Sequence, residues 1–370
     1  MTGAPDPVLT DPAQATPEWL TAVLAASGAL TAGRVTEAAQ DGGRGNWSAN
    51  ARLALAYSPD AQGERPARLF LKLVNAALDD ESFGDSEVTY YTRDYVDAPD
   101  APLLPCYAAA YSPTARRYHL LLADVTETHT AVDDRPPTLE YGLALAEALA
   151  ALHAHWWGAE RLAAAGAPPH SAAHVQAFID VAAPGVVPIV AGFSGGWPAH
   201  WPAQLRAAFD RLPALLARRA AEAQGQTLIH GDVGPGNILV PRTGDRPLYL
   251  IDRQPFNWSL TTWLGAYDLA YALVLDWEPD TRRACETPVL RRYHAELLRR
   301  GVTGYGWEQL WDDYRLCAAM SVYIPVEYCR GGVDERWVPV WRPMLERALA
   351  AADDLDCAAL WGENLGQIGA

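Results

Sequence analysis

Three side chains that can do chemistry stand close together in the segment Leu228–Val240, which reads LIHGDVGPGNILV. His230, Asp232 and Asn237 lie among glycine, proline and apolar residues, and an apolar strand-like run follows at once. A tight turn that happens to be polar has this composition, and so does a catalytic loop. The choice depends on whether the rest of the chain supplies partners for these groups.

The spacing within this segment favours a catalytic loop. His230, Gly231, Asp232, four residues and then Asn237 repeat the spacing of the kinase motif H-R-D-x-x-x-x-N. In that motif the aspartate accepts a proton and the asparagine binds a metal ion. We therefore predict that Asp232 and Asn237 are catalytic residues, with Asp232 as the base.

A second carboxylate, Asp252, ends the apolar run LYLID fifteen residues beyond Asn237. The residues NILVP, a TGD turn and PLYLIDRQ predict a hairpin that returns Asp252 close to Asn237. A carboxylate at the end of an apolar strand needs a cation nearby, and no protein cation is its obvious partner. Two hard oxygen donors suit Mg²⁺. We therefore predict that Asn237 and Asp252 bind this metal.

Lys72 lies in the middle of the apolar strand-like run LFLKLV. A buried ammonium needs a partner, whereas a lysine on an alternating strand can also point to solvent. Glu87 follows fifteen residues later at the start of a predicted helix. Carboxylates favour helix N-termini for electrostatic reasons alone, so Glu87 gains its meaning only through Lys72.

A glycine-rich stretch, DGGRGNWS, separates two strand-like segments and contains Gly42, Gly43 and Gly45. Glycine lets a backbone approach phosphate groups closely, and a glycine-rich hairpin turn is an equally good reading. Together with the lysine, the two carboxylates and the asparagine, this stretch completes the parts that transfer of the γ-phosphoryl group of ATP requires. Those parts are a phosphate cradle, a lysine, a proton acceptor and oxygen ligands for metal.

The motifs HGDVGPGN, LIDRQ and YDLAY resemble those of the aminoglycoside phosphotransferase and choline kinase-like branch of the protein-kinase-like fold, which includes ecdysteroid kinase-like small-molecule kinases. The resemblance covers roughly residues 30 to 350. It implies that Asp232 is the catalytic base and that Asn237 and Asp252 bind magnesium. It also implies that Lys72 contacts the α- and β-phosphates of ATP while Glu87 holds the lysine.

The same resemblance assigns two further regions. It implies that LLLADV is a hinge between two lobes, in which backbone groups from Ala123 to Val125 meet adenine. It implies a structural role for Asp268 of YDLAY, which would brace the catalytic loop. Two departures stand out: Arg253 replaces the tryptophan that often follows the metal-binding aspartate, and the glycine stretch lacks the full G-x-G-x-x-G pattern. The protein-kinase A-P-E segment is absent, which disfavours a protein substrate.

These residues must be positioned by helices and strands. The order of the expected elements, strand-rich first and then helical, predicts an α+β fold with two lobes. We expect a small strand-rich N-lobe over residues 1–123, with an N-terminal helix that Thr16 caps, the glycine-loop sheet and the Lys/Glu helix. A helical C-lobe over residues 124–370 is expected to carry the catalytic loop, the metal-binding hairpin and the substrate-pocket helices. One of these helices is predicted from Thr138 to about His155, with His153 as a hydrogen-bonded core residue.

Composition limits the function further. The formal net charge of −16 repels phosphate backbones and disfavours nucleic acid as a partner. Five scattered cysteines without a C-x-x-C pair indicate reduced thiols and a cytoplasmic location, and neither a signal peptide nor a transmembrane helix is expected. The expected activity is therefore ATP- and Mg-dependent phosphorylation of a hydroxyl on a small molecule.

The substrate stays open at this stage. An antibiotic such as an aminoglycoside and a choline-, sugar- or sterol-like alcohol all suit the resemblance, and Asp276, Glu278 and Glu327 are candidates for holding a cationic or hydroxylated group. A nucleotide-binding pseudokinase and a non-catalytic binding protein of the same fold are the alternatives.

Overall fold

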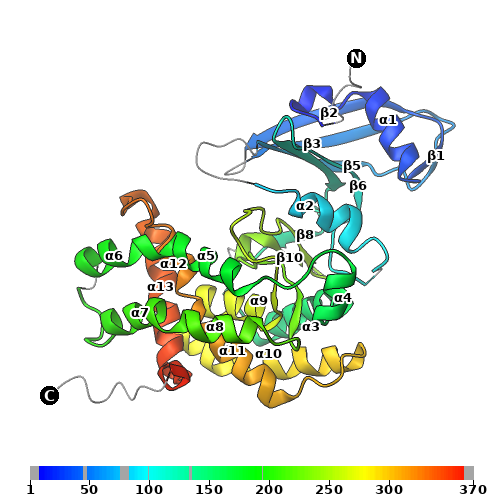
Figure 1. Cartoon of the computed structure of the whole chain (residues 1–370). Coiled ribbons are helices and arrows are strands. Elements are labelled where there is room, and N and C mark those ends of the chain that lie inside the picture. Colours follow the sequence, from blue (N-terminus) through cyan, green and yellow to red (C-terminus); the bar gives the residue numbers. More distant parts are fainter. Residues whose placement is uncertain are drawn as a thin grey trace. The chain divides into compact units, whose positions relative to one another are not determined.

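The computed structural model describes residues 8–44, 48–75, 83–98, 100–132, 136–193 and 195–361 (Figure 1). The chain forms two compact units. Unit 1 consists of Met1–Pro99, Leu103–Thr130 and Leu239–Asn257, and unit 2 consists of Asp100–Pro102, Ala131–Ile238 and Trp258–Ala370. A small strand-rich part and a larger helical part agree with the predicted kinase-like fold class.

Unit 1 is built on a five-stranded antiparallel sheet with the order β2-β3-β5-β7-β6. Alternating residues of β5 explain its two faces: Leu69, Leu71 and Leu73 are buried against the first helix, and Lys72 projects from the opposite face. The strands are β2 (Val35–Arg44), β3 (Ser48–Tyr57), β5 (Arg68–Asn75), β6 (Cys106–Ser112) and β7 (Arg117–Ala123), and β1 (Leu30–Ala32) pairs with β4 (Gln62–Gly63) beside them.

The first helix, α1 (Pro17–Ala26), begins after Thr16, as predicted. The Thr16 hydroxyl accepts a hydrogen bond from the Trp19 N–H at 3.3 Å, and Pro17 occupies the first helical position. Gly28 follows the helix with a φ of +80°, a conformation that glycine adopts without strain. Leu20 and Leu24 of α1 are fully buried and close the apolar core of unit 1.

The predicted Lys/Glu helix differs from expectation in two ways. Only Ser86–Thr89 is α-helical (α2), and Tyr90–Asp94 continues as a π-helical turn. Asp85 occupies the N-cap position but makes no side-chain capping hydrogen bond. The Ser86 hydroxyl instead donates to the Gln254 carbonyl at 2.6 Å, so a tertiary contact replaces the local cap.

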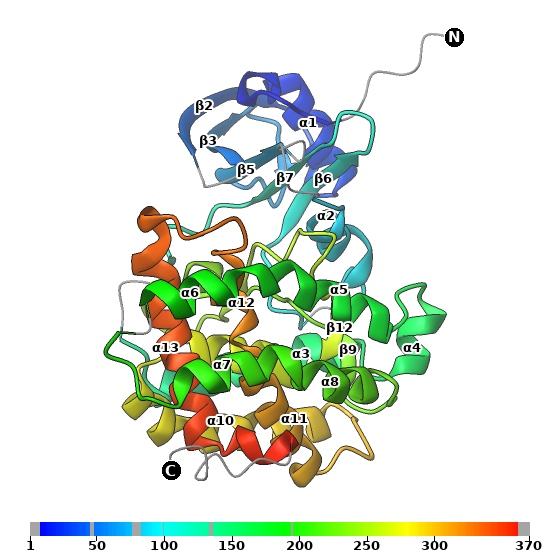
Figure 2. The same ribbon diagram turned by 60° about the vertical axis from the view of Figure 1, so that its left-hand side comes forward.

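Unit 2 is mainly helical (Figure 2). Helix α3 (Leu139–His155) begins after the capping residue Thr138, as predicted, and packs against α10 (Pro279–Arg299). The long helical pattern after Trp201 is divided into α7 (Trp201–Asp210) and α8 (Leu212–Ala220), because Pro213 lies at the start of α8 and cannot continue α7. The remaining elements of unit 2 are α4 (Ala159–Ala164), α5 (Ala172–Ala182), α6 (Val186–Phe193), α9 (Ala266–Ala270), α11 (Trp307–Met320), α12 (Tyr323–Glu327), α13 (Val338–Asp354) and the antiparallel pair of β9 (Gln226–Leu228) and β12 (Thr262–Leu264).

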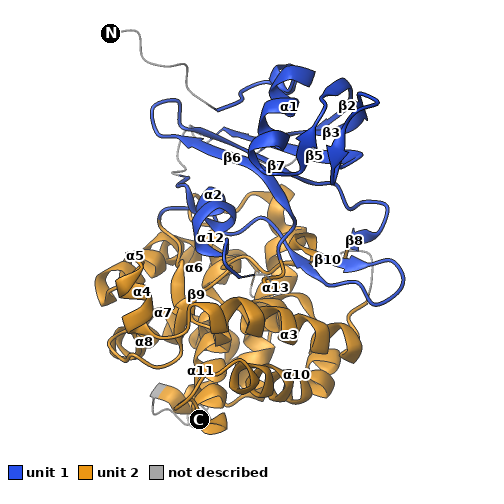
Figure 3. Ribbon diagram, turned by 90° about the vertical axis from the view of Figure 1, so that its right-hand side faces the viewer, with its two compact units in different colours: residues 1–99, 103–130, 239–257 blue, residues 100–102, 131–238, 258–370 orange. Residues whose placement is uncertain are grey.

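The predicted hairpin forms from β10 (Ile238–Pro241) and β11 (Tyr249–Leu250), and most of it belongs to unit 1 (Figure 3). It pairs with β8 (His129–Ala131) in a sheet of order β11-β10-β8. A β-bridge between Phe83 and Phe256 ties the segment after the hairpin to unit 1 as well. The division into lobes after residue 123 stays a prediction. The pairing of β10 with β8 and the bridge between Phe83 and Phe256 explain why residues 239–257, although distant in sequence, belong to unit 1.

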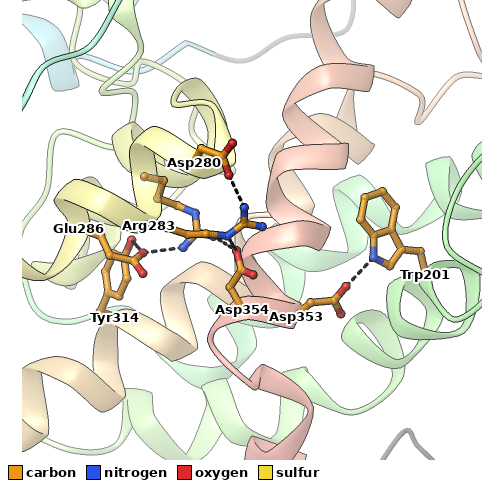
Figure 4. A network of polar contacts seen from close by, with 8 residues as sticks. Trp201, Asp280, Arg283, Glu286, Tyr314, Asp353 and Asp354 are labelled. Carbon is orange, nitrogen blue, oxygen red and sulfur yellow. Dashed lines mark hydrogen bonds and ion pairs between the residues drawn. The ribbon is translucent and has the colours of Figure 1, made fainter.

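A network of arginines and carboxylates fastens α10 to α13 in unit 2 (Figure 4). Asp354 of α13 accepts hydrogen bonds from both Arg282 and Arg283. The buried Arg282 also donates to Glu286 at 2.6 Å, and Arg283 donates to Asp280 at 2.7 Å. Such pairing is what a buried guanidinium requires.

One described helical run, Ala172–Phe193, is long and apolar enough to cross a membrane. It is interrupted at Ala183–Gly185 by a 3₁₀ turn, and Val175, Phe178 and Ile179 are buried within unit 2. One such run is weak support for a membrane span, because core helices of soluble proteins meet the same criteria of length and composition.

Candidate active site

Lys72 lies at the centre of a three-residue ionic cluster in unit 1. Its ammonium Nζ lies 2.7 and 2.9 Å from the two carboxylate oxygens of Glu87 and 2.9 Å from Oδ1 of Asp252. Glu87 is 1% exposed and Lys72 is 9% exposed, so this ammonium does not point to solvent. The predicted pairing of Lys72 with Glu87 is present.

The charges in this cluster support one another. Burial by itself lowers the pKa of the Lys72 ammonium, but the carboxylates of Glu87 and Asp252 outweigh burial and raise it. The lysine therefore stays charged, which a contact with phosphate groups requires. Tyr118 of β7 adds a hydrogen bond from its hydroxyl to Oε2 of Glu87 at 2.5 Å. No local signal in the sequence connects Tyr118 with Glu87, which lies 31 residues earlier, so this partner could not be predicted.

Asp252 departs from the expectation that no protein cation pairs with it, because Lys72 is its partner. Its side chain remains 46% exposed, so it is accessible to a further ligand. Its φ of +58° lies in the left-handed region, which is uncommon for residues other than glycine. Strained backbone of this kind persists where surrounding contacts hold it, and it clusters at functional sites.

Arg253 is a structural residue rather than an anion clamp. Its guanidinium donates to Asp94 Oδ2 at 2.8 Å, and both side chains are 3% exposed. It also lies over the ring of Tyr90, with 5.4 Å between the guanidinium carbon and the ring centroid. The π-helical turn Tyr90–Asp94 presents both partners, so Arg253 braces the segment that follows Glu87.

The candidate catalytic loop lies in unit 2, and its backbone is bound by the carboxylate of Asp268. The backbone N–H groups of His230 and Gly231 donate to the two oxygens of this carboxylate at 2.7 and 2.9 Å. Burial by itself raises the pKa of Asp268, but hydrogen bonding from His153, the charges of His153 and His230 and the Gly231 N–H together lower it. Asp268 therefore stays ionised beneath the loop, in the bracing role that the resemblance implies.

Two neutral side chains donate hydrogen bonds to the carboxylate of Asp232. The Tyr271 hydroxyl donates to its Oδ1 at 2.7 Å, and the Asn237 amide donates to its Oδ2 at 3.1 Å. The same Asn237 nitrogen donates to the Asp232 carbonyl at 2.9 Å. The amide oxygen of Asn237 has no donor among the described residues and is free to bind a cation.

Comparison with known proteins gives matches at the level of structure alone. No protein-family model matches the chain, and no curated protein matches it. A glucosamine kinase in complex with glucosamine, ADP and inorganic phosphate aligns over 92% of this chain and 84% of its own, with 17% identity and a TM-score of 0.53. A Plasmodium vivax ethanolamine kinase aligns over 84% and 82%, with 13% identity and a TM-score of 0.50.

A spectinomycin phosphotransferase in complex with ADP and spectinomycin aligns over 92% of this chain and 99% of its own, with 10% identity and a TM-score of 0.50. The chain has the protein-kinase-like fold of these small-molecule kinases. The predicted fold is thereby confirmed. Identities this low leave the chemistry of the chain to be argued from its own residues.

Within this kinase-like fold, Lys72 is the only lysine of the whole chain, against 28 arginines. The composition replaces lysine by arginine at every other cationic position. Arginine is a planar fork, whereas lysine is a compact point charge on a flexible stem. The chain's single lysine is thus the compact ammonium that lies buried between the two carboxylates. Counting lysines in the sequence would have given this signal without a structure.

Each unit carries one of the predicted metal ligands. Asn237 offers its amide oxygen and Asp252 offers a half-exposed carboxylate, and both are hard donors of the kind that Mg²⁺ prefers. Among the described residues, no group of three or more His, Cys, Asp and Glu side chains is arranged to hold a metal alone.

The glycine stretch of the kinase-like fold is only partly described. Gly42 and Gly43 lie in β2, opposite Ala51 and Asn50, and Gly45 lies outside the described residues. Neither described glycine has a positive φ. A Cβ at Gly43 would meet nothing within 4 Å, and one at Gly42 would meet only the Asn50 carbonyl at 4.0 Å. The fold itself therefore does not require glycine at these two positions.

The predicted adenine-binding segment already uses part of its backbone. The Ala123 N–H donates to the Pro105 carbonyl at 2.9 Å, and the Val125 carbonyl accepts hydrogen bonds from the N–H groups of Thr128 and His129. The Val125 N–H has no acceptor among the described residues. Of these backbone groups, the Val125 N–H is the one that is available to donate a hydrogen bond to adenine.

The three acidic candidates for substrate binding differ in their surroundings. Glu278 is paired with Arg347 at an exposed position, and Glu327 lies 3.0 Å from Arg330. Burial raises the pKa of the Tyr141 and Tyr271 phenols, and the charge of Asp276 adds to both shifts. His153, by contrast, is a fully buried core residue as predicted, with hydrogen bonds to Asp268 and Tyr293.

Proposed function

We propose that this protein is an ATP- and Mg-dependent phosphotransferase that acts on a hydroxyl of a small molecule. The observation that carries the proposal is the cluster around Lys72, in which the chain's single lysine is buried and bound by Glu87 and Asp252. A cluster of this kind prepares an ammonium for phosphate groups, and it occurs here in the fold of small-molecule kinases. The two glycines that the fold does not require support the same reading.

Each residue has a defined role in this proposal. Asp232 accepts the proton of the substrate hydroxyl, and Asn237 orients its carboxylate through the 3.1 Å hydrogen bond. Lys72 binds nucleotide phosphates while Glu87 holds it in place. Asn237 and Asp252 would hold Mg²⁺, which when bound neutralises charge on the phosphates. Lys72, Asp232, Asn237 and Asp252 are all present, and this argues against a pseudokinase.

The substrate that we propose is an alcohol that also carries an amine. Tyr328 supports this, because partial burial and then the charges of Asp232, Glu327 and Asp276 raise the pKa of its phenol to about 12. Glu327 is paired with Arg330, so a cationic group would be attracted chiefly to the aspartates Asp232 and Asp276. The net charge of −16 acts in the same direction over longer range. Glucosamine and ethanolamine, named for two structures of this fold, are amines with a hydroxyl.

Paired substrates would test this proposal. We expect ADP release with glucosamine or ethanolamine to exceed release with glucose or ethylene glycol, which lack the amine. Release should require Mg²⁺ and should be lost in Asp232→Asn. The same assay with GTP in place of ATP measures whether the enzyme prefers adenine or guanine nucleotides. ADP release that is no faster in wild type than in Asp232→Asn, across all acceptors, would contradict the proposed activity.

A further inference from the structure

The motif YDLAY places two side chains on the catalytic-loop candidate from one short element. Asp268 lies in α9 and accepts the backbone N–H groups of His230 and Gly231. Tyr271 begins the π-helical turn Tyr271–Leu275 that continues α9, and its hydroxyl donates to the Asp232 carboxylate. Asp268 therefore holds the loop backbone, while Tyr271 reaches the reactive side chain itself.

The Asp232 carboxylate needs such a holder because its terminal torsion is otherwise soft. Rotation about the bond to an sp² carboxyl group is broad and roughly two-fold, so packing alone does not fix the plane of the oxygens. Here each oxygen has its own donor: Tyr271 at 2.7 Å on Oδ1 and Asn237 at 3.1 Å on Oδ2. Hydrogen bonds to an ionised acceptor are roughly twice as strong as neutral ones. The pair of donors therefore defines one orientation of the base.

The surroundings keep Tyr271 in the donor state. Its side chain is buried, and burial followed by the charge of Asp232 raises the pKa of the phenol well above its usual value. The hydroxyl therefore remains protonated. Residues from Tyr271 to Leu275 are all buried, so the π-helical turn cannot rotate without disturbing the core of unit 2. Local π turns inside helices are rare and frequently occur at functional sites.

We infer that Tyr271 is a positioning residue, whose hydroxyl holds Oδ1 of Asp232 so that the carboxylate faces the substrate hydroxyl. This inference rests on the proposed phosphotransferase function. It goes beyond the role of Asp268, because removal of the Tyr271 hydroxyl leaves the loop backbone bonds to Asp268 untouched.

The first test compares Tyr271→Phe with a matched control, Tyr305→Phe. Tyr305 is also buried in unit 2, and its hydroxyl donates to the Asp313 carboxylate at the same 2.7 Å. We expect Tyr271→Phe to lower kcat by about tenfold or more, the cost of one hydrogen bond to a charged group, with KM for ATP and acceptor unchanged within about twofold. Tyr305→Phe should leave kcat unchanged. A kcat within twofold of wild type in Tyr271→Phe, or equal losses in the two variants, would overturn the inference.

A second measurement does not depend on activity. Melting temperatures of Tyr271→Phe, Asp232→Ala and the double variant form a cycle that isolates the contact between the two side chains. We expect the shifts to be non-additive by about 2 °C or more, because the hydrogen bond couples the two side chains. Additive shifts would overturn the inference even in an active enzyme. A wild-type protein without Mg-dependent turnover would refute the proposed function, and with it the positioning role, whatever the cycle gave.

Discussion

The two units hold the central charges of their candidate residues by opposite means. In unit 1, two carboxylates surround one ammonium, and Tyr118 adds a hydrogen bond to one of them. In unit 2, the Asp232 carboxylate is held by the neutral donors of Tyr271 and Asn237. Position is therefore set by charge pairing in one unit and by hydrogen bonding in the other.

This difference predicts different responses to substitution. Removing one member of a buried ion pair leaves an uncompensated charge, which is strongly unfavourable. Removing one neutral donor from a partly exposed carboxylate leaves a group that water can still solvate. We therefore expect variants of the buried pair Lys72 and Glu87 to affect both folding and function, and variants around Asp232 to affect mainly turnover.

The largest expected effect is the loss of the base in unit 2. Asp232→Asn should lower kcat by roughly 10²–10⁴-fold, or about 3–5 kcal/mol on the barrier, while nucleotide binding and the melting temperature stay near wild type. The amide keeps the shape of the side chain but cannot accept the proton. Asp245→Asn, at an exposed position of the hairpin turn, serves as the control. Wild-type turnover in a folded Asp232→Asn protein would refute the role of Asp232.

The next effect tests charge pairing in unit 1. Lys72→Arg should lower kcat/KM by roughly 10²-fold, because the guanidinium keeps the charge but cannot take the place of a compact ammonium between Glu87 and Asp252. Arg68→Lys, on the same strand but exposed, should have no effect. Kinetics and melts of both variants are the measurement. Full activity in Lys72→Arg would mean that position 72 needs only a positive charge.

A cycle within the same cluster refines this test. Lys72→Ala and Glu87→Ala act on one ion pair, so the loss of activity in the double variant should fall well short of the sum of the single losses. Strict additivity would show that the two side chains do not act as a unit.

The third effect concerns the metal-binding proposal. Without ligand, Asp252→Ala should melt within about 1 kcal/mol of wild type, because Asp252 is half exposed and Lys72 keeps Glu87 as its partner. It should lose most of the stabilisation that Mg·ATP gives, which is about 2.7 kcal/mol at one hundred times Kd. Thermal melts with and without Mg·ATP measure this, with Asp245→Ala as the control. Equal ligand stabilisation in Asp252→Ala and wild type would remove Asp252 from the metal site.

The smallest expected effect is a difference between the two units in how their contribution to stability depends on pH. His119 of unit 1 is buried and accepts the Leu9 N–H at 3.2 Å, and burial lowers its pKa to about 4. The unfolded chain, with a histidine pKa of about 6.5, binds an extra proton between these values, so the free energy of unfolding decreases as pH falls through this window. At pH 5 the loss should be about 2 kcal/mol relative to neutral pH.

Asp268 of unit 2 behaves differently in the same window. Its pKa is lowered from 3.8, so its contribution to stability is complete above that value and is lost only as pH falls further. Urea unfolding at pH 7 and pH 5 should therefore show a smaller acid loss in His119→Phe than in wild type. The same loss in both proteins would assign the acid sensitivity to other groups.

Much of the site could be predicted from the sequence because its signals are local. His230, Asp232 and Asn237 lie within one loop, and their spacing is a local signal. Lys72 is recognisable because it is a charged residue in an apolar strand. Helix starts at Thr16 and Thr138 were predictable because a capping side chain bonds to a backbone group three residues away. In each case a few neighbouring residues carry the whole physical reason.

Tertiary structure alone decided the partners. Asp252 reaches Lys72 across 180 residues, Arg253 pairs with Asp94 across 159, and Tyr271 reaches Asp232 across 39. These contacts depend on strand register and on the direction in which a helix presents its side chains, and no local periodicity encodes either. The π-helical turns that begin at Tyr90 and Tyr271 have no propensity signal, yet they present Asp94 and Tyr271 to their partners. The sequence by itself determined which groups we propose for the chemistry, and packing determined what holds them, because a side chain's partner is fixed only when distant elements meet.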